Sequence, residues 1–311
     1  MSNVNLRKVA IVGCGFVGSA GAFALMQSGL FSEMVLIDVD HERAEGEALD
    51  IGHGMPLAKP MQIYAGSYDD AADAAIIVVT AGANQKPGET RLDLVRKNVD
   101  IFKSIMLEFA KRECPGIMLV VANPVDILTY EAIKYSGMPV NRVIGSGTVL
   151  DTARLKYLLG EHLAVDSRSI HAFIIGEHGD SEFATWSTAN VSGVPLFDFC
   201  RMRGHTHYEE ASREIEANVR NSAYEIIKRK KATYYGIAMS VKRICEAIIR
   251  DEKSVLPVSS FIKEFGVALS MPAIVGKDGI EDLIPVQLND DEKAKLQDSA
   301  KVLRGVIDSL M

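Results

Sequence analysis

The stretch Val9-Ala10-Ile11-Val12-Gly13-Cys14-Gly15-Phe16-Val17-Gly18 decides how this chain begins to fold. Its apolar start predicts a buried strand, and the pattern G-x-G-x-x-G then leads into a helical stretch. Gly13 permits a tight turn, Gly15 lets a pyrophosphate approach the backbone, and Gly18 allows the helix to pack close to the strand. The helix start offers amide donors to phosphates. The expected contacts with a dinucleotide cofactor in this loop are Gly13, Gly15, Phe16, Val17 and Gly18.

A carboxylate ends the second predicted strand. Asp38 follows Gly18 by 20 residues, the spacing at which a dinucleotide-binding fold places an acid against the adenosine ribose. This carboxylate would repel a 2′-phosphate, so the sequence favours NAD over NADP. The alternative, glycines that serve only a tight turn, stays open at this stage.

Beyond this loop, β-branched runs alternate with helical patterns. Strands are expected at 34–38, 75–80, 117–122 and 142–144 in the first half, and at 170–175 and 184–189 in the second. The alternation predicts an α/β fold that starts with a Rossmann domain, a doubly wound parallel sheet, over residues 1–145. After that boundary come long helices and an antiparallel meander beyond residue 255, which predict a mixed α+β substrate domain over residues 146–311.

Composition excludes several classes of protein. The 311 residues carry a net charge of −7, and an acidic, evenly charged surface argues against a nucleic-acid partner. The longest apolar run, 74–79, is too short to span a membrane. The four cysteines have no C-x-x-C spacing and fit reduced thiols in a cytoplasmic protein. His205 and His207 have no evident partner ligands, so no metal site is expected.

A histidine between two glycines follows an apolar run, in Gly176-Glu177-His178-Gly179-Asp180. An imidazole titrates near neutral pH and suits a proton donor in a pocket. Asp151 and Arg154 lie three residues apart, so both can share one face of a helix. A guanidinium matches a carboxylate in two parallel hydrogen bonds. With the nucleotide loop, these residues indicate hydride transfer on a small hydroxy or keto acid.

A loop that contains Pro87 and Gly88 joins a strong strand to a long helix that begins near Arg91. Such a loop can close over a pocket and expel water. Arg91 would then reach the substrate carbonyl only when the loop is shut. A cation aimed at developing negative charge typically supplies a few kcal/mol of transition-state stabilisation.

In their order along the chain, these segments resemble the L-lactate/L-malate dehydrogenase family, and its bacterial lactate-type members in particular. The matching segments are 13–18, Asp38, 81–91, 123–126, 150–154, 176–180 and 232–236. The resemblance implies that His178 donates a proton to the keto oxygen and that Asp151 bonds the other ring nitrogen. It also implies that Arg154 binds the substrate carboxylate, that Arg91 polarises the carbonyl, and that the protein is a homotetramer whose other partners are small molecules.

Within the family, the position of Gln85 sets the substrate. Malate-type members place an arginine there to pair a second carboxylate, whereas a neutral glutamine suits a methyl group, since an unpaired buried carboxylate is costly to desolvate. The resemblance therefore implies pyruvate and L-lactate. Because of Lys86, malate dehydrogenase remains an alternative: a one-residue shift of the loop would place a cation at this position. A non-catalytic NAD(H)-sensing protein on the same fold is the other alternative.

Four more roles complete the predicted site, and those of Ser146, Thr233 and Ile237 depend mainly on the resemblance. Asn123 would hydrogen-bond at the substrate or nicotinamide end. Ser146 would lie near the nicotinamide carboxamide, Thr233 would line the substrate pocket, and Ile237 would pack on the nicotinamide ring.

Lys156 and His171 stand where many bacterial members of the family bind fructose 1,6-bisphosphate between subunits. His171 fits that pattern. Lys156 replaces an arginine, so it keeps the charge and loses the planar fork. An allosteric effector site at these two residues therefore stays open.

Overall fold

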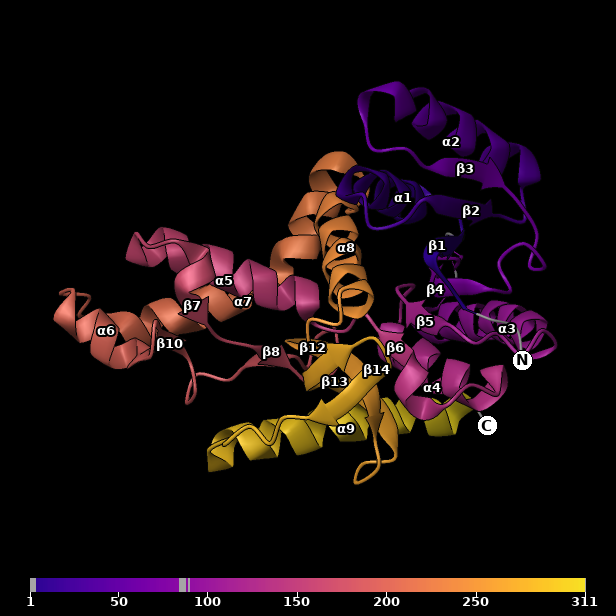
Figure 1. Ribbon diagram of the computed structural model, residues 1–311. Helices are drawn as coiled ribbons and strands as arrows, with labels where there is room; N and C mark the ends of the chain where they lie inside the picture. Colours follow the sequence, from indigo (N-terminus) through magenta and orange to yellow (C-terminus); the bar gives the residue numbers. More distant parts are fainter. Residues whose placement is uncertain (1–3, 84–87, 89, 311) are drawn as a thin grey trace.

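One nine-stranded sheet runs through the protein, with strand order β14-β13-β12-β6-β5-β4-β1-β2-β3 (Figure 1). The computed structural model describes residues 4–83, 88 and 90–310, without the side chain of Arg91. The strands of this sheet are β1 (Asn5–Val12), β2 (Glu33–Ile37), β3 (Gln62–Ala65), β4 (Ala74–Val79), β5 (Ile117–Val120), β6 (Val143–Gly145), β12 (Ser254–Ile262), β13 (Val267–Gly276) and β14 (Gly279–Leu283).

Strands β1 to β6 pair in parallel and form a doubly wound sheet. The chain winds from β1 outward through β2 to β3, then returns to β4 on the other side of β1. This reversal opens a crevice at the carboxyl ends of β1 and β4, which is where such sheets bind ligands. The helices of this half are α1 (Phe16–Ser28), α2 (His41–His53), α3 (Arg91–Ala110) and α4 (Val125–Ser136), with short 3-10 turns η1 (Met55–Leu57) and η2 (Val140–Arg142).

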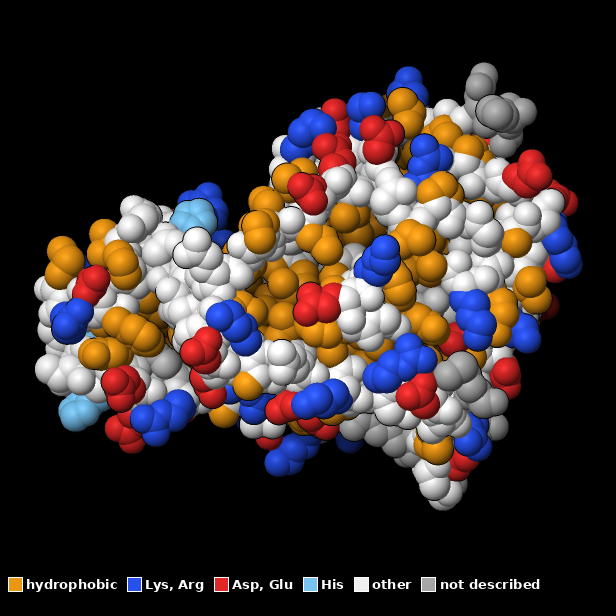
Figure 2. Space-filling view, turned by 90° about the horizontal axis from the view of Figure 1, so that it is seen from below, with side chains coloured by type: hydrophobic (Ala, Val, Ile, Leu, Met, Phe, Trp, Pro, Cys, Tyr) orange, Lys and Arg blue, Asp and Glu red, His pale blue; other side chains and the backbone are white. Residues whose placement is uncertain are grey.

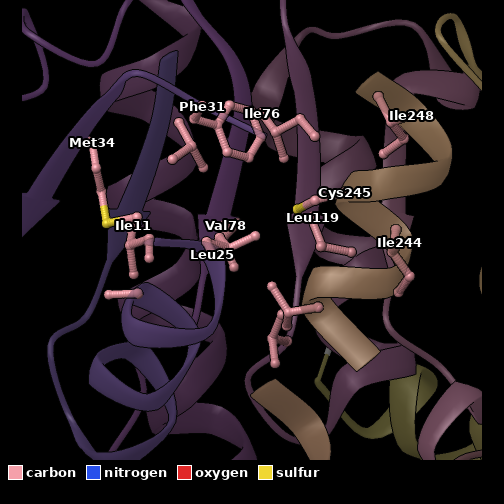
Figure 3. Close-up of a cluster of buried hydrophobic side chains, with 14 of the residues drawn as sticks. Ile11, Leu25, Phe31, Met34, Ile76, Val78, Leu119, Ile244, Cys245 and Ile248 are labelled. Atoms are coloured by element: carbon pink, nitrogen blue, oxygen red, sulfur yellow. The ribbon is translucent and has the colours of Figure 1, made fainter. Parts of the chain in front are cut away.

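Both faces of the parallel sheet are buried, as parallel sheets require. Along β1, Val9 and Ile11 belong to one apolar cluster, and Ala10 and Val12 belong to the other. Figure 3 shows the first cluster, where Ile244 on α8 (Tyr235–Ile249) lies over the sheet. A helix from the second half of the chain therefore covers one face of the first half.

The second half continues the same sheet. Strand β12 joins β6 in antiparallel fashion, with Ser259 opposite Gly145, and β13 and β14 complete the expected meander. The other elements are α5 (Val149–Leu163), η3 (Ser167–Ser169), β7 (Ile170–His171), β8 (Ile174–Ile175), β9 (Phe183–Ala184), β10 (Asn190–Val191), β11 (Val194–Pro195), α6 (Leu196–Met202), α7 (Tyr208–Lys230) and α9 (Asp290–Leu310). The predicted fold class, a Rossmann sheet followed by an α+β part, is confirmed.

The expected strand at 184–189 is wrong. Strand β9 ends at Ala184, and the next residues turn, because Thr188 N donates to Thr185 O and Ala189 N donates to Trp186 O. The turn leads into the small sheet β11-β10-β7 beneath α6. In the described part of the chain, no helix is long and apolar enough to cross a membrane.

Candidate active site

The loop between β1 and α1 has the conformation that its glycines predict. Gly13 has a φ of +100°, and a Cβ on it would lie 2.5 Å from the Ala81 nitrogen. A Cβ on Gly18 would lie 1.8 Å from the Gly13 carbonyl oxygen, so these two glycines are required by packing. Gly15 differs, because a Cβ there would meet no atom of residues 4–83, 88 or 90–310 within 4 Å. Because Gly15 has no side chain, the space at the start of α1 stays open.

Asp38 lies beside this open space. The Cys14 N–H donates to Asp38 Oδ2 at 2.6 Å, and the Asp40 N–H donates to Oδ1 at 3.0 Å. Each carboxylate oxygen can accept a further hydrogen bond, so Asp38 can still receive a ribose hydroxyl. Among the residues that the structure describes, no side chain caps α1 at Gly15, and the first amide donors of this helix suit a phosphate group. Open space, amide donors and a carboxylate together fit a dinucleotide.

His178 and Arg154 are joined by one carboxylate. Asp151 Oδ2 lies 2.6 Å from Nδ1 of His178, and Asp151 Oδ1 accepts from Arg154 Nη1 at 2.7 Å. Asp151 and Arg154 lie on the first turns of α5, as their spacing predicts, while His178 follows β8. The structure therefore brings together three of the predicted site residues. Because Asp151 holds both partners, the imidazole and the guanidinium keep a fixed spacing.

The charges in this site shift the pKa values of His178 and Asp151. Burial works against the charged imidazole, but the charge and hydrogen bond of Asp151 outweigh it and raise the pKa of His178 to about 9. Burial also disfavours the ionised carboxylate, yet His178 and Arg154 hold the pKa of Asp151 below its usual range. At neutral pH the pair is therefore an imidazolium and a carboxylate.

A second buried carboxylate fixes the backbone of the histidine. Asp126, at the start of α4, accepts from His178 N at 2.7 Å and from Ser259 Oγ at 2.6 Å. Burial raises the pKa of Asp126 to about 6. No role was predicted for Asp126 or Ser259, although Asp126 stands in the segment 123–126 that resembles the family. The signal for Asp126 was a carboxylate two residues after an Asn-Pro pair.

Glu182 is a third residue for which the sequence predicted no role. Its Oε2 lies 3.8 Å from Nδ1 of His178, and its side chain is 4% exposed. Together with Asp151 and His178 it forms a group whose donor atoms lie within 4.8 Å of one another, close enough to hold a metal ion. Arg154 already pairs with Asp151, and a guanidinium at the group disfavours a further cation. The arrangement suits proton transfer better than metal binding.

Asn123 and Ser146, two further predicted residues, lie around the crevice at the carboxyl ends of the parallel strands. The Asn123 main-chain oxygen accepts from Asn98 Nδ2 at 3.0 Å, directly before a cis peptide bond to Pro124. Ser146 is buried after β6, and its N–H donates to Val120 O. Both follow the carboxyl ends of central parallel strands.

The segment that carries Thr233 and Ile237 meets the nucleotide loop. The ring of Tyr234 stacks on Phe16 at 5.5 Å between centroids. Thr233 and Ile237 on either side are half-buried, and Ile237 packs against the sheet cluster beneath α8. Thr233 thus stands near the loop that would hold the cofactor.

The remaining predicted residues are Gln85, Lys86, Arg91, Lys156 and His171. Gln85 and Lys86 lie outside the described residues. Arg91 is the first residue of α3, where Thr90 and Asp93 form a capping box, but its side chain is not described. Lys156 on α5 is half-buried, and burial lowers its pKa. His171 is exposed on β7. No ion pair of Lys156 is found with residues 4–83, 88 or 90–310.

Comparisons with known proteins cover both halves of the chain. The family model for the lactate/malate dehydrogenase NAD binding domain matches residues 7–145, and the model for the lactate/malate dehydrogenase alpha/beta C-terminal domain matches residues 148–311. An L-lactate dehydrogenase of Acetivibrio thermocellus is 52% identical, over 99% of either chain. L-lactate dehydrogenase 1 of Clostridium acetobutylicum is 50% identical, over 97% of this chain and 98% of that protein.

Solved structures agree with the sequence relatives. A lactate dehydrogenase from a Medee basin deep-sea metagenome library superposes with a TM-score of 0.95 at 44% identity, over 100% of this chain and 99% of that one. The ligand-bound minor L-lactate dehydrogenase of Enterococcus mundtii also gives a TM-score of 0.95 at 44% identity, over 98% of each chain.

Proposed function

Because the chain belongs to the lactate/malate dehydrogenase family, we propose that it is an NAD-dependent L-lactate dehydrogenase with a His–Asp proton relay and an arginine that binds the substrate carboxylate. The observation that carries this proposal is the line of contacts from Arg154 through Asp151 to His178. Curated L-lactate dehydrogenases about half identical over nearly the whole chain support it. NAD is the cofactor of the N-terminal domain.

When bound, NADH supplies the hydride that reduces the keto carbon of pyruvate. Gly13, Gly15, Gly18 and Asp38 would hold the cofactor. His178 donates the proton that the substrate oxygen needs, because Nδ1 is engaged by Asp151 and Nε2 is the ring nitrogen left for the substrate. In the direction of lactate oxidation the neutral imidazole takes that proton back.

Arg154 would anchor the substrate carboxylate. One of its nitrogens binds Asp151, and within the described part of the chain the guanidinium has no other hydrogen-bond partner. Its remaining N–H groups can form two parallel bonds to a carboxylate. Since Asp151 holds both side chains, the anchored substrate would keep its keto oxygen at a fixed distance from the imidazole.

Other members of the site remain proposals. Arg91 would polarise the substrate carbonyl once the loop before α3 closes, and Asn123 would hydrogen-bond at the substrate or nicotinamide end. Thr233 would line the substrate pocket, Ser146 would lie near the carboxamide, and Ile237 would pack on the nicotinamide ring. The division into a cofactor domain, 1–145, and a substrate domain, 146–311, is likewise proposed.

We also propose a cytoplasmic homotetramer. All four cysteines are free and buried, which fits a reducing compartment. Phe23 on α1 and Tyr235 and Met239 on α8 are 50%, 68% and 57% exposed, and apolar side chains left exposed suit subunit contacts. Hydrophobic side chains also gather in the middle of the face seen from below (Figure 2). Light scattering of the purified protein would give the subunit number.

A substrate panel tests the proposed activity. Purified protein with NADH should reduce pyruvate much faster than oxaloacetate, and NADPH should be the poorer cofactor. A clear preference for oxaloacetate would favour malate dehydrogenase, and NADH binding without turnover would favour a sensing protein. Each assay is run with and without fructose 1,6-bisphosphate, because activation by this sugar bisphosphate would support an effector site at Lys156 and His171.

Gln85→Arg is expected to move the substrate preference toward oxaloacetate. A guanidinium at this position would pair the second carboxylate, and a charge-assisted bond of this kind contributes about 1.5–3 kcal/mol, or roughly 10- to 150-fold in kcat/KM. The measurement is the ratio of kcat/KM for oxaloacetate and pyruvate. Lys86→Arg is the matched control and should leave the ratio unchanged. If only Lys86→Arg moved the ratio, the assignment of Gln85 would be wrong.

Alanine at two glycines of the nucleotide loop should separate cofactor binding from folding. Gly15→Ala adds a Cβ that meets no atom in the described part of the chain, so the melting temperature should stay near that of the parent while NADH binds more weakly. Gly18→Ala drives a Cβ into the Gly13 carbonyl and should lower stability by several kcal/mol. Thermal melts and NADH fluorescence titrations check both. Unchanged NADH affinity in Gly15→Ala would place the pyrophosphate elsewhere.

A further inference from the structure

A second carboxyl group lies next to the proton donor, and the proposed relay does not use it. We infer that Glu182 is a positioning residue for this reaction: its buried carboxyl group, close to Nδ1 of His178, helps the imidazole to keep its proton as the pH rises. The inference rests on the proposed function, since it assigns Glu182 to the proton donor of that reaction.

The turn after β8 brings Glu182 back to the imidazole. Glu182 N donates to Gly179 O at 3.3 Å, which closes the turn that begins at the histidine. The Glu182 Oε2 atom then lies 3.8 Å from Nδ1 of His178, the nitrogen that Asp151 contacts at 2.6 Å. The side chain of Glu182 is only 4% exposed, so solvent screens the charge of its carboxylate weakly.

Charged groups from three elements face this carboxyl group. Asp151 and Arg154 come from α5, and His178 comes from the turn itself. Arg220 comes from α7, where its Nη2 donates to the main-chain oxygen of Glu182 at 3.3 Å. Arg220 is also paired with Glu216 at 3.0 Å, and its Nε is buried without a partner in the described part of the chain.

The fourth element is α4, whose Asp126 accepts from the His178 main-chain N–H. His178 is thus held at its backbone by one carboxylate and at its ring by another, and Glu182 approaches the same ring nitrogen as a third acid. Three acids around one imidazole are more than orientation requires, because Asp151 and Asp126 already fix the ring and its backbone.

The consequence is a coupled titration of Glu182 and His178. Burial, followed by the charge of Asp151, raises the pKa of Glu182 to about 8, so this acid is neutral near pH 7. As the pH rises and Glu182 ionises, its negative charge appears beside the imidazolium and holds the proton on His178. Removal of the carboxyl group should leave Asp151 alone to hold that proton, and the imidazole should deprotonate at lower pH.

Glu182→Gln tests this directly, because glutamine keeps the shape and cannot ionise. The first readout is the alkaline limb of kcat/KM for pyruvate. The second is carbethoxylation of His178 by diethyl pyrocarbonate in the free enzyme, followed by peptide mass spectrometry, since only the neutral imidazole reacts. Both midpoints should fall by at least about half a pH unit, while kcat/KM below the limb changes little.

Two variants complete the experiment. Glu182→Asp keeps an acid but withdraws it from Nδ1, so its midpoints should lie between those of the parent and Glu182→Gln. Glu177→Gln is the matched control: its carboxyl group accepts from Ser181 Oγ at 2.5 Å, and both midpoints should stay with the parent. A purely structural role for Glu182 predicts lower stability with unmoved midpoints.

Midpoints that stay at the parent values in Glu182→Gln would overturn the inference. If that variant did not fold, an unmoved midpoint in Glu182→Asp would overturn it instead. The carbethoxylation readout needs neither substrate nor cofactor. A protein that does not reduce pyruvate would therefore refute the proposed function, while the midpoint of His178 modification would still decide the role of Glu182.

Discussion

Replacing His178 with asparagine is expected to lower kcat/KM for pyruvate reduction by about 10²- to 10⁴-fold, the usual contribution of a positioned acid. Asparagine can still donate a hydrogen bond to Asp151, so the site should stay assembled, but it has no proton to transfer. Steady-state kinetics measure the loss, and NADH titrations and thermal melts check that binding and folding survive. His53→Asn, at an exposed histidine that ends α2, is the matched control and should behave as the parent.

The pH profile gives the prediction a second measurement. The folded-state pKa of His178 is raised to about 9, so the imidazolium persists above its usual range. In the proposed relay, pyruvate reduction needs this protonated form and should fall as the pH rises through about 9. Lactate oxidation needs the neutral form and should rise over the same interval. The limb should vanish in His178→Asn. A variant that kept the limb at the same pH and most of its rate would show that another group donates the proton.

The nucleotide loop could be predicted from sequence because its requirements are local. Gly13 must adopt a positive φ and Gly18 must pack against the Gly13 carbonyl, and both demands fall within one strand–turn–helix segment. Helices α5 and α9 could be predicted from the sequence equally well. Their apolar residues recur at helical spacing, which is why long helices were expected in the second half of the chain.

The pairing of His178 with Asp151 was predicted in a different way. Nothing in the sequence places two residues 27 positions apart in contact, so this prediction came from the order of motifs that resembles a known family. By contrast, the placement of Asp151 and Arg154 on one face of a helix followed from their spacing alone, and the structure adds the contact between them. Both contacts are present in the structure.

The role of Asp126 could not be assigned from the sequence, because it comes from long-range packing. Asp126 meets His178 across 52 residues and Ser259 across 133 residues. Whether a given acid is exposed or buried depends on which elements cover it, and that is decided only when β12 joins β6. The same reason applies to α8, which packs on the parallel sheet although it comes from the other half of the chain.

The second large effect is expected at Arg154. Arg154→Lys keeps the positive charge and loses the planar fork, so one of two parallel bonds to the substrate carboxylate should be lost. Such a charge-assisted bond contributes about 1.5–3 kcal/mol, and the poorer position of the remaining charge adds to this, so the KM for pyruvate should rise by about 10²-fold or more. NADH affinity should not change.

Arg168→Lys is the matched control for this experiment. Arg168 forms a two-bond pair with Asp166, with Nε to Oδ1 at 3.0 Å and Nη2 to Oδ2 at 2.6 Å, on the surface at η3. Exposed pairs contribute about 0–1 kcal/mol to stability, so this variant should retain the parent kinetics. It controls for the general effect of exchanging a paired arginine for lysine.

The measurement also separates two roles of Arg154. If the guanidinium binds the substrate, Arg154→Lys should raise KM for pyruvate and erase the preference for pyruvate over pyruvamide, which has no carboxylate. If it only braces Asp151, the main effect should be on His178, because a looser carboxylate holds the imidazolium less well. The alkaline limb would then move to lower pH while pyruvate and pyruvamide lost rate in equal measure. That second pattern would remove Arg154 from the substrate-binding residues and leave it as a support of the His178–Asp151 pair.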